Sequence, residues 1–150
     1  MGYRSDVRIT ISKKGYSKMK NYLENYVKEK ELDRDDIFEL LDSPDIELEN
    51  KYQKYIGWND LKWYDCYPDI IAINEALSYI ENEGYSYKFT RIGEELTDIE
   101  EYGCDGDKDT KNNLYVDYPY IDRGFDDLFM ENEMKKQDII IKKFNKEQER

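Results

Sequence analysis

The stretch from residue 56 to residue 73 constrains the fold more than any other part of the chain. It contains both tryptophans, Trp58 and Trp63, and its apolar residues change their period inside it. Before Tyr64 their spacing fits a strand, whereas after Pro68 it fits a helix. Because aromatic side chains bury large areas, we predict that this stretch forms the middle of the core, with a turn or bulge that brings both tryptophans inward.

Alternation of apolar and polar residues predicts further strands elsewhere in the chain. Near the N-terminus, Val7, Ile9 and Ile11 share one face, whereas Arg8 and Thr10 share the other, which is typical of a half-buried strand. The same pattern covers residues 3–12, 85–92, 96–102 and 114–121, and residues 45–50 permit a short edge strand.

Apolar residues at helical spacing predict helices over residues 16–30, 33–41, 69–82 and 126–144. Ser17 and Asp33 are suitable N-caps for the first two. The run Ile139, Ile140 and Ile141 exceeds one helical face, which predicts burial on two sides or contact with a partner. We therefore predict a single α+β domain over residues 1–150, with a mainly antiparallel sheet and helices packed against one face.

The charge of the chain is strongly acidic and unevenly distributed, with a formal net charge of −12. Residues 31–50 carry one basic and nine acidic side chains, and residues 84–133 carry five basic and fourteen acidic ones. Both ends of the chain are basic. Such a protein repels free nucleic acid and attracts basic proteins. We predict that the chain does not bind nucleic acid directly. We predict instead that its partner is a basic protein, itself a nucleic-acid-binding protein.

Several classes of protein are disfavoured by composition. Histidine is absent, so the commonest general base and metal ligand is missing. Cys66 and Cys104 show no pairing pattern, which is typical of a reducing cytosol. No apolar run approaches the roughly 20 residues of a membrane span, and the N-terminus is too polar for a signal peptide. We expect a cytoplasmic, non-enzymatic protein that has no cofactor and contacts no membrane.

One acidic segment invites a metal-binding interpretation. Asp105, Asp107 and Asp109 have the spacing of the first calcium ligands of an EF-hand. However, Thr110 stands where that motif requires glycine, and Val116 stands where it requires glutamate. We therefore predict a solvated acidic loop and no bound metal.

Two other groups of residues have a structural and a functional interpretation. The carboxylates of residues 94–101 could perform acid–base chemistry only if one were desolvated at a fixed distance from another. A solvated or partner-binding surface is the preferred interpretation. The aromatic group of Trp58, Trp63, Tyr64 and Tyr67 could stack on nucleic-acid bases, but such platforms need cationic surroundings. Because the neighbours of these rings are neutral to acidic, we predict core packing instead.

Three pieces of the chain together resemble a known group of proteins. They are the opening Met-Gly-Tyr-Arg-Ser-Asp-Val, the Trp-Tyr and Tyr-Pro-Asp block of residues 58–69, and residues 89–94 with 98–100. These pieces resemble small uncharacterised proteins carried by bacteriophages and prophages. The resemblance covers about half of the chain. It implies a mobile-element origin and a bacterial host cell, and it implies no particular chemistry.

These observations predict a non-enzymatic acidic protein that binds a basic surface of a host protein. An anti-defence inhibitor of the anti-CRISPR kind is the concrete form, because spaced carboxylates can mimic phosphates. Two alternatives stay open: an accessory or structural protein whose acidity serves solubility, and a hydrolase that uses carboxylates with Mg²⁺. Formation of a homodimer also stays open. The predicted partner-binding residues are Asp35, Asp36, Glu39, Glu94, Glu95, Asp98, Glu100, Glu101, Asp105, Asp107 and Asp109.

Overall fold

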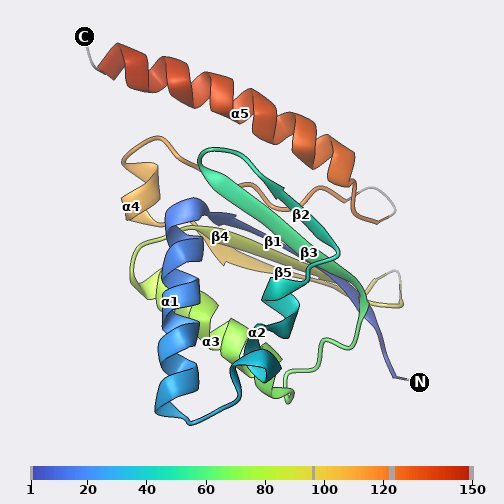
Figure 1. Ribbon diagram of the computed structural model, residues 1–150. Helices are drawn as coiled ribbons and strands as arrows, with labels where there is room; N and C mark the ends of the chain where they lie inside the picture. Colours follow the sequence, from blue (N-terminus) through green and yellow to red (C-terminus); the bar gives the residue numbers. More distant parts are fainter. Residues whose placement is uncertain (1, 96, 122–123, 149–150) are drawn as a thin grey trace.

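A five-stranded sheet forms the centre of the computed structural model, which describes residues 2–95, 97–121 and 124–148 (Figure 1). The strands are β1 (Ser5–Ser12), β2 (Ile46–Glu49), β3 (Gln53–Leu61), β4 (Tyr87–Ile92) and β5 (Ile99–Cys104). They lie in the order β2-β3-β1-β4-β5, and every neighbouring pair is antiparallel. The predicted α+β class with a mainly antiparallel sheet is confirmed.

Helices lie on both faces of this sheet (Figure 1). They are α1 (Lys13–Glu29), α2 (Arg34–Asp42), α3 (Pro68–Asn82), α4 (Asp107–Thr110) and α5 (Asp127–Gln148). Helices α1, α2 and α3 cover one face, as expected, whereas α5 runs across the opposite face. Met130 and Met134 hold α5 there by packing on Tyr55 of β3. Within the part of the chain that is described, no helix combines the length and apolarity that a bilayer span requires.

The main core lies between the sheet and helices α1–α3, and both tryptophans are part of it. Trp58 is 2% exposed and Trp63 is 7% exposed, and their ring centroids are 6.0 Å apart. A shift in the β1–β3 register near the end of β3, together with a positive φ of 55° at Asp60, lets both rings turn inward. The predicted bulge and the central position of this stretch are confirmed.

The first helix begins earlier than its sequence pattern predicts. Strand β1 passes directly into α1, and Ser12 is the N-cap, with its hydroxyl accepting a hydrogen bond from the Gly15 amide at 3.2 Å. Ser17, the expected cap, therefore lies inside the helix. By contrast, Asp33 caps α2 as predicted and accepts a hydrogen bond from the Asp35 amide at 2.9 Å.

Residues 114–121 were expected to form a strand, and that expectation is wrong. The segment is extended and runs over the same sheet face as α5, and none of it belongs to a strand of the sheet. Leu114, Val116 and Pro119 are buried, whereas Tyr115, Asp117 and Tyr118 are exposed. Burial thus alternates over residues 114–117 without a neighbouring strand to pair with, and the alternation breaks at Tyr118, which is exposed.

Candidate protein-binding surfaces

The first acidic surface, called here the α2 surface, consists of Asp35, Asp36, Glu39 and Asp69. Helix α2 buries Ile37, Phe38 and Leu41, and this amphipathic spacing turns its acidic side chains to solvent. Asp35 and Asp36 lie in the first turn, where the helix dipole favours negative charge. Burial, with the nearby charge of Glu39, raises the pKa of Asp69 at the start of α3. The acidic surface therefore continues from α2 onto α3.

The β4–β5 hairpin separates its carboxylates into paired and free ones. Arg91 bonds Asp98 through Nη2 at 2.7 Å and Glu100 through Nε at 3.1 Å. Hydrogen bonds from Arg91 and from the Tyr3 hydroxyl lower the pKa of Asp98. Asp98 and Glu100 therefore help to hold the hairpin together. The hairpin carboxylates that remain exposed without an ion pair among the described residues are Glu94, Glu95 and Glu101.

The expectation that Asp109 contacts a partner is wrong. Its side chain is 2% exposed, and Oδ2 accepts a hydrogen bond from the Ser86 amide at 2.6 Å. Asp105 bonds Lys88 Nζ at 2.7 Å, and Asp107 lies exposed at the start of α4. The three carboxylates thus have separate roles, and the described residues contain no group of three or more potential metal ligands.

The fold gathers carboxylates at one end of the sheet in a way that the sequence did not suggest. In strand order from β2 to β5, Asp45, Asp60, Asp6, Glu94 and Asp98 lie at or beside the strand ends on that side, and we call this row the acidic sheet end. Asp45 accepts from the Asn59 amide at 2.7 Å, and Asp6 accepts from the Asp60 amide at 2.9 Å. Neighbouring strands are about 5 Å apart, so residues at these strand ends lie near one another.

The acidic sheet end is only partly neutralised. Arg91 is engaged by two hairpin carboxylates. Arg4 donates from its guanidinium to the carbonyl oxygen of Asp60 at 2.9 Å, and its amide donates to Glu94 at 3.1 Å. Sequence reasoning missed Asp6, Asp45 and Asp60 because they come from three distant segments. The predicted bulge near residue 60 was the one available signal, since the Asp6 contact stabilises it.

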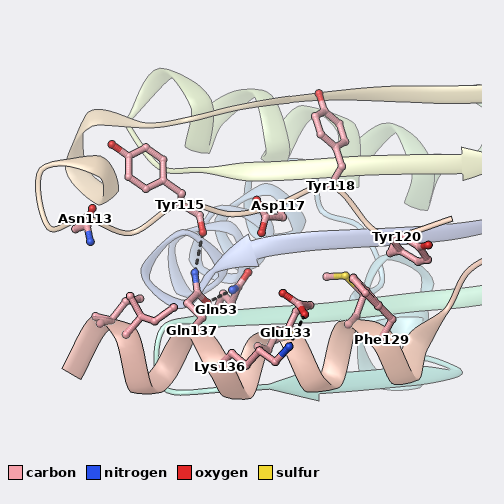
Figure 2. Close-up of a pocket in the computed structure, with 14 residues that line it drawn as sticks. Gln53, Asn113, Tyr115, Asp117, Tyr118, Tyr120, Phe129, Glu133, Lys136 and Gln137 are labelled. Carbon is pink, nitrogen blue, oxygen red and sulfur yellow. Dashed lines mark hydrogen bonds and ion pairs between the residues drawn. The ribbon is translucent and has the colours of Figure 1, made fainter. Parts of the chain in front are cut away.

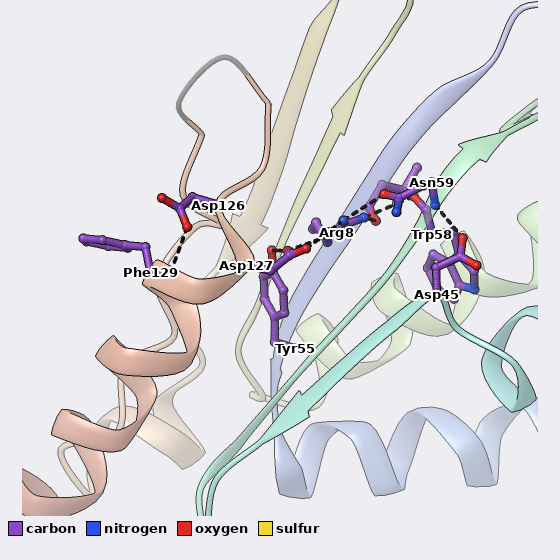
Figure 3. Close-up of polar contacts among 9 residues, drawn as sticks. Arg8, Asp45, Tyr55, Trp58, Asn59, Asp126, Asp127 and Phe129 are labelled. Carbon is purple, nitrogen blue, oxygen red and sulfur yellow. Dashed lines mark hydrogen bonds and ion pairs between the residues drawn. The ribbon is translucent and has the colours of Figure 1, made fainter.

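A largely buried ionic network attaches α5 to the sheet (Figure 3). The Arg8 side chain is 3% exposed, and its Nε bonds Asp127 at 3.1 Å. Tyr55 also donates to Asp127, at 2.7 Å, and Arg8 Nη2 donates to Asn59 at 2.8 Å. Gly57 faces Arg8 across β1 and β3, and a Cβ there would collide with the Arg8 side chain. The glycine therefore makes room for the guanidinium.

The chemistry of this network indicates an anchor. Burial alone would raise the pKa of Asp127, but the hydrogen bonds from Arg8 and Tyr55 outweigh it, and the pKa is lowered. Burial and the hydrogen bond to Asp127 raise the pKa of Tyr55. Asp127 therefore stays ionised and Tyr55 stays protonated at neutral pH. Both groups hold their charge states firmly, which suits a structural contact between α5 and the sheet.

Comparison of the chain with family models, with curated proteins and with solved structures yields no match.

Proposed function

We propose that this protein is a non-enzymatic, acidic binding protein of phage or mobile-element origin, which engages a basic surface of a host protein. The contact residues in this proposal are the exposed acids of the α2 surface and of the acidic sheet end, together with Glu95 and Glu101 of the hairpin. Asp109 is excluded because it is buried. Asp98, Glu100 and Asp105 contribute charge, but they are engaged by basic groups of the chain itself.

The row of carboxylates along the sheet end is the observation that carries this proposal. Like charges held close together oppose folding, so a solvated chain gains nothing from collecting them at one edge. The ends of neighbouring strands, about 5 Å apart, hold them together on one side of a rigid sheet. Such an array suits a basic surface that normally receives phosphates, since complementary potentials speed association and select the partner.

An inhibitor of a bacterial defence system, of the anti-CRISPR kind, is the concrete form of this proposal. The basic channel of a nucleic-acid-guided effector is a strongly positive host surface, and an acidic protein would compete with nucleic acid for it. The resemblance of the chain to phage and prophage proteins supports this context. The protein would act in the cytoplasm of the bacterial host.

The test begins with capture of partners from a bacterial host lysate by the immobilised full chain. A partner identified by mass spectrometry is purified, and its dissociation constant is measured at about 50 and about 300 mM salt, since salt screens exposed charge pairs. A variant with Asp35→Lys, Asp36→Lys, Glu94→Lys and Glu95→Lys should bind more weakly and with less dependence on salt. Its fold should persist, because exposed substitutions usually change stability by about 0.5 kcal/mol or less.

The control reverses charges of the opposite sign on another surface, with Lys13→Glu, Lys14→Glu and Lys18→Glu on α1. This variant should bind the purified partner as the unaltered chain does. The proposal is wrong if the acidic reversal leaves the partner fully bound, or if the unaltered chain binds nucleic acid directly. In either case the acidity of the chain serves solubility.

A further inference from the structure

A groove lies on the sheet face opposite α1–α3, between α5 and the extended segment that precedes it (Figure 2). Its volume is about 520 Å³, which is within the range of ligand pockets. Aromatic rings form much of its lining, and two of them, Tyr120 and Phe129, stack with centroids 4.1 Å apart. Tyr115 and Phe129 are 50% and 40% exposed, so these rings remain accessible from solvent.

Two carboxylates enter the groove from opposite sides (Figure 2). Asp117 comes from the extended segment, and among the described residues it has no hydrogen bond or ion pair. Glu133 comes from α5 and pairs with Lys136 at 3.2 Å, one helical turn away. Both residues of that pair are substantially exposed, so the contact is weak and can be exchanged for a better one. Lys136 also lines the groove, so its two carboxylates and one ammonium leave one net negative charge between aromatic walls, with Asp117 as the free carboxylate.

A buried acceptor adds a third feature. Gln53 is 4% exposed and lines the groove, and its Oε1 has no hydrogen-bond partner within the described structure. Its amide nitrogen is already used, because it donates to Gln137 Oε1, and Gln137 donates in turn to the Tyr115 carbonyl at 2.8 Å. A buried acceptor without a donor is costly, and this oxygen is closed to solvent, so a ligand in the groove would reach it only after the side chains around it move.

We propose that this groove binds a cationic side chain of the protein partner, specifically an arginine guanidinium. Aromatic faces attract cations, and a planar guanidinium stacks on rings while donating several hydrogen bonds to carboxylates and amides. Asp117, which has no cation beside it among the described residues, disfavours an anion in the groove, whereas the charge of Glu133 is offset by Lys136. This inference rests on the proposed function in that the partner is basic, and it adds the chemical group that the partner inserts.

The test uses N-acetyl-arginine amide as the probe, titrated into the isotope-labelled full chain and followed by NMR. We expect a dissociation constant on the order of 1 mM, with shifts at the rings of Tyr115, Tyr118, Tyr120 and Phe129. N-acetyl-citrulline amide has nearly the same shape without the charge, and it should bind about tenfold more weakly. Equal binding of the two probes, or shifts confined to the α2 surface, would overturn the proposal.

Variants make the assignment specific. Asp117→Asn and Glu133→Gln should each weaken arginine binding about threefold to tenfold. Glu131→Gln is the matched control, because Glu131 is on the same helix but does not line the groove. It should leave binding unchanged. If Asp117→Asn binds the probe as the unaltered chain does, the groove is not the site. A spectrum of each variant that matches the folded chain shows that lost binding is not lost folding.

The two proposals fail separately, because the arginine probe needs no protein partner. Binding of the probe in the groove, combined with no effect of acidic reversal on the partner, would retain this site and reject the acidic surfaces. Loss of the partner on acidic reversal, combined with no probe binding, would do the opposite. Sedimentation velocity tests whether a second copy of the chain occupies the groove. If the chain self-associates and the probe no longer binds, a second copy fills the groove and the arginine assignment is wrong.

Discussion

At the scale of single residues, the side chain that best explains the second face of the sheet is Arg8. Alternation along β1 placed Arg8 and Thr10 on the polar side of a half-buried strand. Both are almost fully buried, because α5 and the segment before it cover that side. The burial of Arg8 is compensated there because Asp127 and Asn59 accept hydrogen bonds from it, and the Phe125 ring centroid lies 4.7 Å from the guanidinium carbon. A polar strand face is therefore no proof of exposure.

The first prediction concerns Asp127→Asn. The substitution leaves Arg8 buried without its counter-charge, and we expect unfolding at pH 7 to become easier by about 2 kcal/mol. This is less than for a fully buried pair, because the Asp127 side chain is 31% exposed. Urea denaturation followed by tryptophan fluorescence measures the change, with Asp126→Asn as the neighbouring control. An unchanged midpoint would mean that the Asp127 charge is not needed and that the methionines and the hydrogen bonds of Gln137 hold α5 on the sheet.

The second prediction is that Asp127→Asn changes how the free energy of unfolding depends on pH. The folded-state pKa of Asp127 lies below its ordinary value of 3.8. Its stabilisation is therefore complete above the unfolded-state pKa and is lost as the pH falls through the lower, folded-state pKa. The unaltered chain should lose stability from roughly pH 5 downward, and Asp127→Asn should lose less over that interval. Parallel pH profiles of the two proteins would contradict this assignment of the carboxylate.

At the scale of elements, the sequence predicted a helix or strand well where its own apolar face packs on the core. It predicted poorly where a segment distant in the sequence buries the element. Helix α3 begins and ends within one residue of its predicted range, because its buried residues follow the helical repeat. Residues 114–121 alternate like a strand but lie alone beneath α5, and alternation reports burial without reporting hydrogen-bond partners. Of the run of three isoleucines, Ile141 is buried on the sheet side, whereas Ile139 and Ile140 are exposed.

The candidate sites show the same limit. Sequence located the acids of α2 and of the hairpin, because these are dense in the chain. It could not gather Asp6, Asp45 and Asp60 at one sheet end, since that requires the strand order. It also assigned Asp109 to the surface, although the Ser86 amide needs that carboxylate in the interior. Charge counts describe a region, whereas pairing decides which of its carboxylates stay free.

Helix α4 and the loop before it provide an element-scale prediction: no tight calcium binding at residues 105–109. Asp109 already accepts from a buried amide, and Asp105 already pairs with Lys88. Calcium needs six to eight oxygen ligands, and these two carboxylates would have to leave their partners to supply them. Titration calorimetry with calcium chloride should detect no micromolar affinity. Micromolar binding that Asp107→Asn abolishes would show that the loop rearranges around the ion.

At the scale of the whole molecule, the acidic side chains and the apolar core occupy different parts of the fold. The main apolar core fills one face of the sheet, whereas the acidic residues collect on α2 and at one sheet end. Basic residues gather at the start of α1 and along the second half of α5. The charges behind the net value of −12 are therefore unevenly distributed, and many side chains of like charge are neighbours. Their repulsion acts on the folded state more than on the expanded unfolded chain.

This arrangement predicts that salt stabilises the protein. Between about 10 and 150 mM NaCl the Debye length falls from roughly 30 to roughly 8 Å, which screens repulsion across the acidic surfaces. The urea midpoint should rise over that interval. A variant with Asp35→Asn, Asp36→Asn, Glu94→Gln and Glu95→Gln should start from a higher midpoint at low salt and rise less. Lys13→Gln with Lys14→Gln should rise more, because it removes compensating charge. A midpoint that falls with salt would mean that ion pairs such as Arg91 with Asp98 outweigh the repulsion, and the acidic surfaces would then cost the fold nothing.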